Sequence, residues 1–490
     1  MDYKEKLKAS RDRVSGAPKD TFDEEMESDR GRSINSAAVR RLQQKTQVFP
    51  LETNAAVRSR LTHSLEVQQV GRYIAKLILK KLGEDRLNEF NLADKKEGFV
   101  SAIEIACLLH DVGNPPFGHF GEEAINHWAK STLLPIFDEK FGDNIEDDIR
   151  VKDLMKFEGN AQAIRLLHSL QKLNLSYTQI ACLLKYTRAA HEPKPENGDR
   201  FNYRKKKPGF YFSESEFVEK LRSELNINDG CRFPLTYVME AADDISYCIA
   251  DLDDALDKRI LTVDQLHEAI STTWDKLKIG KLPEDDIEGN RYLTDVINSG
   301  YERYKKEPHN KSHAYILTLR TTLVNDLANY ASDRFIDNHE SVFNGTLDES
   351  LLDGSDKFYL ATKTLKKVAS SHVFSNKEVE RLELKGHAVI SGLLNIYTPL
   401  LKLSFSDFKK LMQTNMLKPY PIETRLFHDL PQKHKHTFEE AVIVLYERDT
   451  VSSEDETTEL YYRARLIIDY VSGMTDRFAL DEYRDLSATA

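Results

Sequence analysis

Apolar residues along this chain recur mostly at spacings of three and four. Residues 65–78 and 161–170 show the rhythm clearly, and such spacing is typical of one buried face of an α-helix. The alternation with period two that a half-buried strand requires is scarce, and "PGFYFS" at 208–213 is the best short candidate. The pattern predicts a mainly α protein.

Polar and Pro/Gly-rich stretches interrupt the helical pattern and mark candidate connections. We expect linkers at 83–98, at the acidic stretch 138–148 and at the Pro-rich stretch 191–209, and a polar loop at 447–459. The chain shows neither an internal repeat nor a long low-complexity tract. These breaks predict a first domain that ends near residue 260 and a helical second part wrapped onto it.

Composition narrows the class of protein. Hydrophobic residues make up 40% of the 490 residues and charged residues 30%, as in ordinary globular proteins. The longest apolar runs, such as 103–109, are far shorter than the ~20 residues of a membrane helix. The N-terminus is charged and lacks the apolar segment of a secretory signal. Four cysteines without a CxxC pair indicate neither a zinc knuckle nor a disulfide framework. We therefore expect a cytoplasmic protein without a membrane partner.

The formal net charge of -11 disfavours a general nucleic-acid-binding surface, but the basic residues are unevenly spread. Arg30, Arg32, Arg40, Arg41 and Lys45 lie close together in the sequence, and 205–207 is a run of three lysines. Each could be an ordinary solvated cation. Together, local basic clusters in an acidic chain fit a focused anion site.

The richest chemistry lies in "LLHDVGNPPFGHFGEE". An apolar run, predicted to be a buried helix, ends in the adjacent pair His110 and Asp111, and a Gly/Pro loop then leads to His119 and Glu122. Imidazole and carboxylate ligands together suit Mn, Fe, Zn or Mg. Two ligands are too few for a metal site, so other parts of the chain must supply more.

Further ligand candidates stand in two other predicted helices. His63 begins one amphipathic helix, and Asp243, Asp244 and Asp251 lie in an otherwise apolar one. Burying an unpaired carboxylate is costly, so acidic residues in such a helix need partners. His63 could instead be a hydrogen-bonded core histidine, and the aspartates could be surface charges. The joint pattern of His, His-Asp and a distant Asp favours a metal site.

This pattern resembles the HD-domain metal phosphohydrolases, and most closely the bacterial deoxyguanosinetriphosphate triphosphohydrolase (dGTPase) family. The resemblance extends from about Asp29 to Tyr483 and rests on several long motifs in order. These are the stretch 27–76, "HDVGNPPFGHFGEEAIN", "FEGNAQAIRLLH", "RFPLTYVMEAADDISYCIADLDDA" and "SGMTD". The resemblance implies an N-terminal extension (1–28), an HD-domain catalytic core (29–260) and a helical C-terminal region (261–490) that completes the nucleotide pocket and the oligomer contacts.

The resemblance also implies roles for matching residues. The metal ligands would be His63, His110, Asp111 and Asp243, and the catalytic pair would be His119 and Glu122. Gln47, Val48, Tyr247 and Asp251 would surround the deoxyribose. The triphosphate would be held by Arg60, Asn160, Lys185, Tyr186 and Lys207.

The base would be read from the C-terminal part of the chain. The resemblance points there to Phe374, Glu383 and Arg425. A carboxylate such as that of Glu383 can accept the N–H donors of guanine. Surface pairing on helices is the alternative for these residues. Met416 departs from the family pattern, in which a basic residue would fit.

The implied reaction is hydrolysis of dGTP to deoxyguanosine and inorganic triphosphate with a divalent metal. Mg²⁺ or Mn²⁺ is the favoured metal, and Zn²⁺ or another transition metal is the alternative. The resemblance further implies a homo-oligomer, a hexamer before a tetramer, and single-stranded DNA as an effector. Two alternative functions stay open: a dNTP triphosphohydrolase of relaxed specificity, and a dGTP-binding sensor without catalysis. A cyclic-dinucleotide phosphodiesterase fits less well, because Asn114 replaces the lysine of its HDxGK motif.

Overall fold

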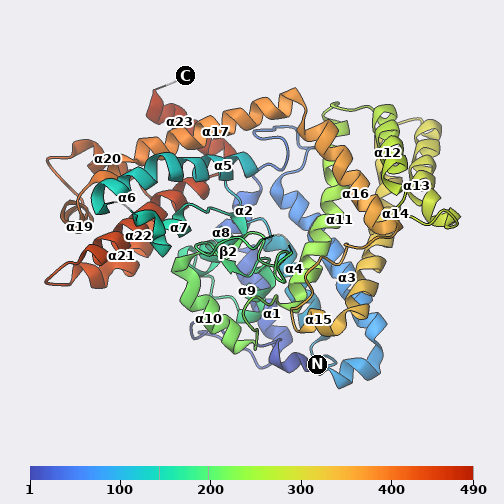
Figure 1. The fold of residues 1–490 in the computed structure, drawn as a ribbon, viewed down its shortest axis with the longest axis horizontal. Coiled ribbons are helices and arrows are strands. Elements are labelled where there is room, and N and C mark those ends of the chain that lie inside the picture. Colours follow the sequence, from blue (N-terminus) through green and yellow to red (C-terminus); the bar gives the residue numbers. More distant parts are fainter. Residues whose placement is uncertain (143, 197, 489–490) are drawn as a thin grey trace.

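A computed structural model of the chain describes residues 1–142, 144–196 and 198–488, and it is helical almost throughout (Figure 1). Two short strands, β1 (Arg188–Ala189) and β2 (Pro208–Phe210), pair in parallel. The prediction of a mainly α protein is confirmed, and β2 forms within the "PGFYFS" stretch.

The first hydrophobic core gathers around three helices that pack against one another: α3 (Arg60–Glu89), α4 (Lys96–Leu109) and α11 (Pro234–Asp257). A capping box stabilises the start of α3: the Ser59 side chain accepts the backbone N–H of Thr62, and the Thr62 side chain accepts the backbone N–H of Ser59. Along α3, Val70, Ile74 and Ile78 are buried. The helices that pack around these three are α1 (Phe22–Ile34), α9 (Tyr177–Leu183), α14 (Lys311–Asp337) and α16 (Lys357–Ala369).

A second core joins α5 to the C-terminal helices. Here α17 (Lys377–Tyr397) lies along α5 (Gly118–Trp128) and α23 (Asp476–Ser487), as Figure 1 shows near the C-terminus. The other helices of this core are α6 (Leu134–Phe141), α7 (Ile149–Leu154), α18 (Pro399–Lys402), α19 (Phe405–Thr414), α20 (Pro421–Asp429), α21 (Gln432–Tyr446) and α22 (Ser453–Ser472). Each core contains residues from both sides of position 260, so the boundary there stays a prediction.

The remaining helices cover these cores. They are α2 (Ala37–Leu42), α8 (Gly159–Arg165), α10 (Ser215–Glu224), α12 (Val263–Lys278), α13 (Ile287–Lys306) and α15 (His339–Phe343).

Two predicted connections are shorter than expected. Helix α3 continues to Glu89 through a kink at Gly83 (φ 72°), where glycine adopts the left-handed conformation at little cost. Helix α22 begins at Ser453, because Ser452 and Asp455 cap its first turn. The predicted linker at 83–98 and the predicted loop at 447–459 were therefore wrong over about half their lengths.

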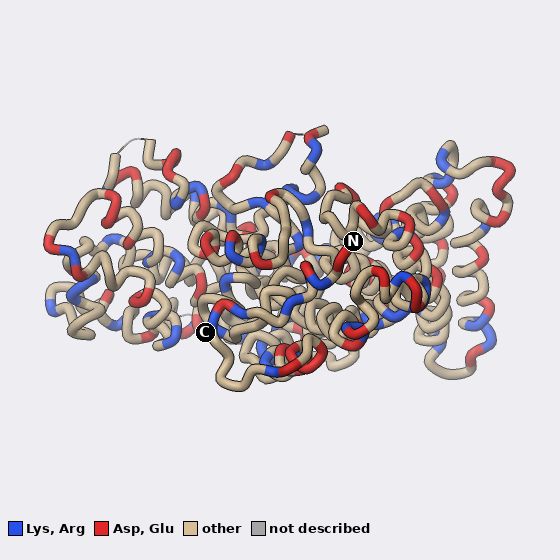
Figure 2. The backbone as a smooth tube through the Cα atoms, turned by 90° about the horizontal axis from the view of Figure 1, so that it is seen from below, with Lys and Arg blue, Asp and Glu red and all other residues tan. Residues whose placement is uncertain are grey.

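Acidic and basic residues are interspersed along the molecule, as Figure 2 shows. All four cysteines are buried and unpaired. Among the described residues, no single helix has both the length and the apolar composition of a membrane span. Residues 377–402 and 405–414 meet these criteria only together, as a pair bent by 101°.

Candidate active site

The end of α4 delivers the His-Asp pair. The helix stops at Leu109, and the chain turns through Gly113 and two prolines before α5 begins at Gly118. At Gly113 a Cβ atom would lie 2.1 Å from the carbonyl oxygen of Gly159, so only glycine permits this close approach to α8. His110 is the C-cap residue of the helix and keeps helical backbone angles (φ -57°, ψ -30°), so Asp111 is the first of the pair beyond the helix.

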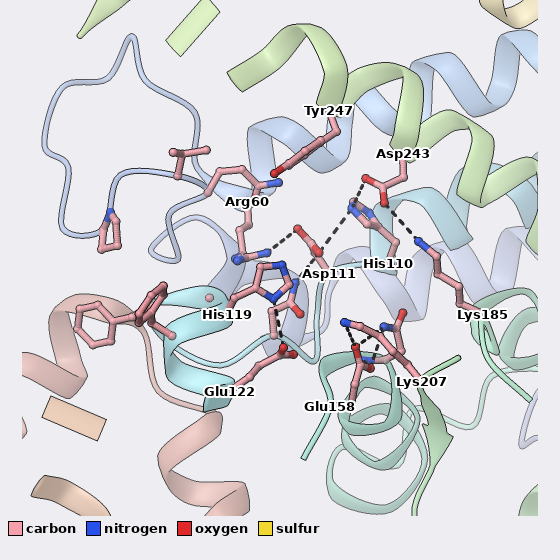
Figure 3. Close-up of a pocket in the computed structure, with 18 of the residues that line it drawn as sticks. Arg60, His110, Asp111, His119, Glu122, Glu158, Lys185, Lys207, Asp243 and Tyr247 are labelled. Atoms are coloured by element: carbon pink, nitrogen blue, oxygen red, sulfur yellow. Dashed lines mark hydrogen bonds and ion pairs between the residues drawn. The ribbon is translucent and has the colours of Figure 1, made fainter. Parts of the chain in front are cut away.

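Three of the four predicted metal ligands converge in space. Ligand atoms of His63, His110 and Asp243 all lie within 4.8 Å of one another. Asp243 Oδ1 is 3.4 Å from Nε2 of each histidine. His63 is fully buried at the start of α3, while α11 supplies Asp243 and the end of α4 supplies His110 (Figure 3).

The donor set fits a divalent cation. His110 Nδ1 donates to the carbonyl oxygen of Cys107 (2.7 Å), which orients the ring so that Nε2 faces Asp243. This Nε2 atom is buried and has no hydrogen-bond partner among the described residues. A buried, unsatisfied imidazole nitrogen beside a carboxylate is the arrangement that a cation would complete.

The fourth predicted ligand, Asp111, stands slightly apart. Its Oδ1 is 3.6 Å from His110 Nε2. Arg60 donates to its Oδ2 (2.8 Å) and Asn114 donates to its Oδ1 (2.5 Å). Both carboxylate oxygens therefore have partners within the chain, and the ligand role of Asp111 stays a prediction.

The charges of this cluster influence one another strongly. Burial alone would disfavour a charged imidazole, but the carboxylates of Asp111 and Asp243 raise the pKa of His110 to about 9. Against the opposing effect of burial, His110, His63 and Lys185 hold the pKa of Asp243 well below its usual range. His110 and Arg60 likewise lower the pKa of Asp111 against the effect of burial, so both carboxylates stay ionised beside the imidazoles.

His119 and Glu122 form the predicted pair on the first turn of α5. His119 Nδ1 is 3.2 Å from Glu122 Oε2, while Glu122 Oε1 accepts the N–H of Gly159 (2.8 Å). Although burial opposes it, the bond from His119 and the charge of Lys207 lower the pKa of Glu122. An ionised carboxylate only accepts hydrogen bonds, so Nδ1 carries the proton and Nε2 can exchange one. The His119 side chain is 86% exposed, toward the cavity (Figure 3).

Cationic side chains border the same space, each beside a carboxylate. Lys207 pairs with Glu158 (2.8 Å), which also accepts bonds from the Asn160 amide. Lys185 lies 3.7 Å from Glu240 and 3.8 Å from Asp243. Despite burial, these carboxylates raise the pKa values of both lysines, so both stay charged.

These groups surround one cavity of about 420 Å³, within the size range of small-molecule sites. Predicted residues that line it are Gln47, Val48, Arg60, His110, Asp111, His119, Glu122, Asn160, Lys185, Tyr186, Lys207, Asp243, Tyr247, Phe374 and Glu383. Tyr247 and Phe374 stand with ring centroids 6.3 Å apart. Asp251 is buried close to the Tyr247 side chain, and burial raises the pKa of its carboxyl well above the usual value.

Several sequence expectations are placed elsewhere. Arg425 does not line the cavity; it is exposed on α20 and donates to the carbonyl oxygen of Pro421 on its own helix. Of the residues in the two basic clusters, only Lys207 lines the described cavity. Arg30 pairs with Glu104 (2.7 Å) and Lys205 with Glu192 (3.5 Å). Arg30 and Lys205 therefore lie outside the cavity, and the structure does not bring them to the anion site that the clusters predicted.

Three polar residues of the site were not among the predicted ones. Asn114 bonds to Asp111, Glu158 neutralises Lys207, and Glu240 holds Lys185. Asn114 and Glu158 lie within motifs that were recognised as wholes, "HDVGN" and "FEGN". Glu240 lies three residues before Asp243 on α11, a spacing that places both on one helix face.

Comparison with known proteins agrees with this geometry. Residues 60–186 match the HD domain, and residues 426–485 match the phosphohydrolase-associated domain. A protein of Enterobacter sp. (strain 638) named deoxyguanosinetriphosphate triphosphohydrolase is 48% identical over 94% of this chain and 93% of its own length. Proteins of the same name from Yersinia pseudotuberculosis (46%) and Serratia proteamaculans (47%) are similar over 100% of this chain and 99% of their own.

The HD-domain match covers α3, the His110–Asp111 turn and α5, which carry His63, His110 and the His119–Glu122 pair. The full-length relatives extend the likeness over both hydrophobic cores. The expected family and the expected enzyme class are confirmed: the chain is a hydrolase that belongs to the deoxyguanosinetriphosphate triphosphohydrolase family.

Proposed function

We propose that this enzyme hydrolyses dGTP to deoxyguanosine and inorganic triphosphate, with a divalent metal as cofactor. The observation that carries the proposal is that the His119–Glu122 pair, the His63–His110–Asp243 cluster and three cationic side chains meet at one cavity. The names of the full-length relatives support dGTP as the substrate.

The metal would be held by His63, His110 and Asp243, with Asp111 as the fourth ligand. Mg²⁺ and Mn²⁺ are our first choices, and the two imidazoles also suit Zn²⁺. When bound, the metal would act as a Lewis acid on the phosphate oxygens.

The triphosphate would be held by Arg60, Lys185 and Lys207, helped by Asn160 and Tyr186. In the structure each of the three cations is beside a carboxylate of the chain. Arg60 Nε is moreover buried without a hydrogen-bond partner among the described residues. Phosphate oxygens would take over these cations, which are already charged and positioned.

His119 would move the proton that the reaction requires. Attack by water at the α-phosphorus breaks the bond to O5′, and an alkoxide is a poor leaving group unless it is protonated. Glu122 keeps the proton on Nδ1, so Nε2 is the atom that can transfer a proton at the α-phosphate. The deoxyribose would lie against Gln47, Val48 and Tyr247, with Asp251 behind the tyrosine.

The base would lie between Phe374 and Glu383, whose carboxylate can accept the N–H donors of guanine. Arg425 stays a predicted base reader that the single chain does not bring to the cavity. The homo-oligomer, whether hexamer or tetramer, and single-stranded DNA as an effector stay predictions from the resemblance.

Tyr247→Ala should narrow the preference for dGTP over GTP. The tyrosine ring faces Phe374 and would fill the space beside C2′, where GTP carries an additional hydroxyl. Sites of this kind discriminate such pairs by on the order of 10²-fold, so most of that factor should disappear. Tyr247→Phe keeps the ring and serves as the matched control. The ratio of kcat/KM values for dGTP and GTP measures the effect, and an unchanged ratio in Tyr247→Ala contradicts the sugar role.

The substrate proposal is tested by a product assay with all four dNTPs and GTP, each with Mg²⁺, with Mn²⁺ and after chelation. We expect dGTP to yield deoxyguanosine and triphosphate with either metal, and we expect no product after chelation. Equal rates with all four dNTPs would favour a relaxed-specificity dNTP triphosphohydrolase, and tight dGTP binding without any product would favour a sensor.

The bond that breaks can be followed with 18O-water. Because Arg60, Lys185 and Lys207 would hold the phosphates on the far side from O5′, attack at the α-phosphorus places the label in triphosphate and none in deoxyguanosine. Mass spectrometry of the two products reads the result. Label in orthophosphate with dGDP as co-product would mean attack at the γ-phosphorus and would overturn this proposal.

A further inference from the structure

The "SGMTD" motif (472–476) joins α22 to α23, far from the catalytic loop in sequence but beside it in space. Its last residue, Asp476, is 2% exposed. The carboxylate of Asp476 accepts three hydrogen bonds: from the N–H of Phe117 (3.0 Å), the N–H of Thr46 (2.9 Å) and the Thr46 hydroxyl (2.5 Å). Oδ1 serves Phe117, and Oδ2 serves Thr46.

These donors lie next to two separate segments of the cavity wall. Phe117 directly precedes α5, and His119 stands two residues farther along the chain. Thr46 directly precedes Gln47 and Val48, which line the cavity. One buried carboxylate therefore ties the segment that carries His119 to the segment that carries Gln47.

The conformation of Phe117 requires such support. Its φ of 62° lies in the left-handed region, which is unfavourable for a residue with a side chain. Its ring fits because Gly386 on α17 lacks a Cβ atom, which would lie 2.5 Å from it. The bond to Asp476 holds the backbone at this point, where the chain changes direction into α5.

A second set of bonds connects the same segments. Lys45 is buried, and its ammonium group donates to the carbonyl oxygens of Asn114 (2.5 Å) and Ser472 (3.2 Å). The N–H of Asp476 donates to the carbonyl oxygen of Gln44 (3.3 Å). The motif is thus bonded directly to the segment 44–46 and, through Lys45, to the loop after the His-Asp pair.

We propose that Asp476 is a positioning residue that sets the distance and orientation of His119 relative to the sugar-contacting segment at Gln47 and Val48. The inference rests on the proposed function of the cavity. It deepens that function by assigning the C-terminal motif a part in catalysis and in sugar selection. Asp476 acts through Phe117 and Thr46 and does not itself line the cavity.

A merely structural role, as an anchor of α23, is the alternative, and the chemistry of the carboxylate separates the two. Asp476→Asn has nearly the same shape but a single acceptor oxygen for donors on two sides. One side must lose its bond and face an NH₂ group. The first turn of α23 keeps its own cap, since the Thr475 hydroxyl accepts the N–H of Phe478.

The experiment compares three full-length variants with the parent enzyme. Asp476→Asn cuts the link, Thr46→Val removes the hydroxyl donor alone, and Asp481→Asn on the same helix is the matched control. The Asp481 carboxylate pairs with the exposed Arg477 on the surface of α23. For each variant we would measure kcat and KM for dGTP, and the dGTP/GTP ratio of kcat/KM. Metal content, the thermal unfolding midpoint and amide hydrogen exchange of residues 44–50 and 112–120 complete the comparison.

For Asp476→Asn we expect kcat to fall by about 10- to 100-fold, the usual effect of displacing a reacting group by ~1 Å. The dGTP/GTP ratio should fall as well, with metal content unchanged, because the cluster at His63, His110 and Asp243 does not touch Asp476. Amide exchange should accelerate in both segments. Thr46→Val should alter the ratio by about 2- to 10-fold, as for one hydrogen bond, with kcat close to that of the parent.

The inference is overturned if Asp476→Asn matches Asp481→Asn in kcat, in sugar ratio and in amide exchange. It is also overturned if Asp476→Asn lowers only the unfolding midpoint while the folded enzyme keeps parental kinetics. Failure of the proposed function looks different, because the parent enzyme would then release no triphosphate from dGTP. The hydrogen-exchange comparison would still decide whether Asp476 joins the two segments.

Discussion

His119→Ala should lower kcat for dGTP by on the order of 10²–10⁴-fold, the usual contribution of a general acid–base group, while leaving metal content and helicity unchanged. His119 is exposed to the cavity, and its described hydrogen bond runs to Glu122. Removal of the His119 imidazole therefore abolishes proton transfer without opening a void in either core. Rapid-quench kinetics, metal analysis and circular dichroism measure the three quantities.

Two neighbouring substitutions sharpen this experiment. Glu123→Ala changes the next, exposed carboxylate on α5 and should keep the parental rate. Glu122→Gln leaves one oxygen to accept from both His119 and Gly159, so the imidazole loses its fixed tautomer and kcat should fall by a smaller factor than in His119→Ala. A near-parental kcat in His119→Ala would remove this residue from the mechanism.

Asp243→Asn should abolish both bound metal and activity. The carboxylate is the only acidic member of the three-residue group in the described structure, and it lies 3.4 Å from both imidazoles. Loss of an outer partner of a metal ligand already costs 10- to 100-fold in affinity, so loss of a ligand should cost at least about 10²-fold. His63→Ala should show the same joint loss from the other side of the cluster.

Asp244→Asn is the matched control for this prediction. Asp244 is the next residue on α11, but its carboxylate pairs with Lys366 (2.8 Å), away from the histidines. It should keep metal and activity. Elemental analysis after dialysis, together with circular dichroism, compares the variants. Full metal occupancy in Asp243→Asn and His63→Ala would show that these residues are not ligands.

Local features of the site could be predicted from the sequence because helices fix short-range geometry. The three-residue spacing of His119 and Glu122 is visible in the sequence, but we expected a Gly/Pro loop to present them. The structure instead places both on the first turn of α5, where this spacing brings them to one helix face, 3.2 Å apart. The apolar run that ends at His110, followed by Gly and Pro, predicts a buried helix end. Asp243 and Tyr247, four residues apart on α11, both reach the cavity for the same reason.

Charge pairing over long distances could not be predicted in this way. Lys205 and Lys207 look alike in the sequence, yet the first pairs with Glu192 while the second lines the cavity. Arg30 looked like an anion-binding residue and instead pairs with Glu104 on α4. A surface cation takes the partner that packing brings nearest, and packing depends on the whole chain.

The helical class and the positions of His63 and His110 at helix ends follow from the sequence alone, because periodicity and capping act over a few residues. The pairing of Glu158 with Lys207 and the place of Arg425 outside the cavity follow from the three-dimensional packing of the chain. The same packing also brings Asp476 to the loop before His119. Such contacts join segments up to several hundred residues apart, and no local pattern encodes them. They form when the two hydrophobic cores pack together.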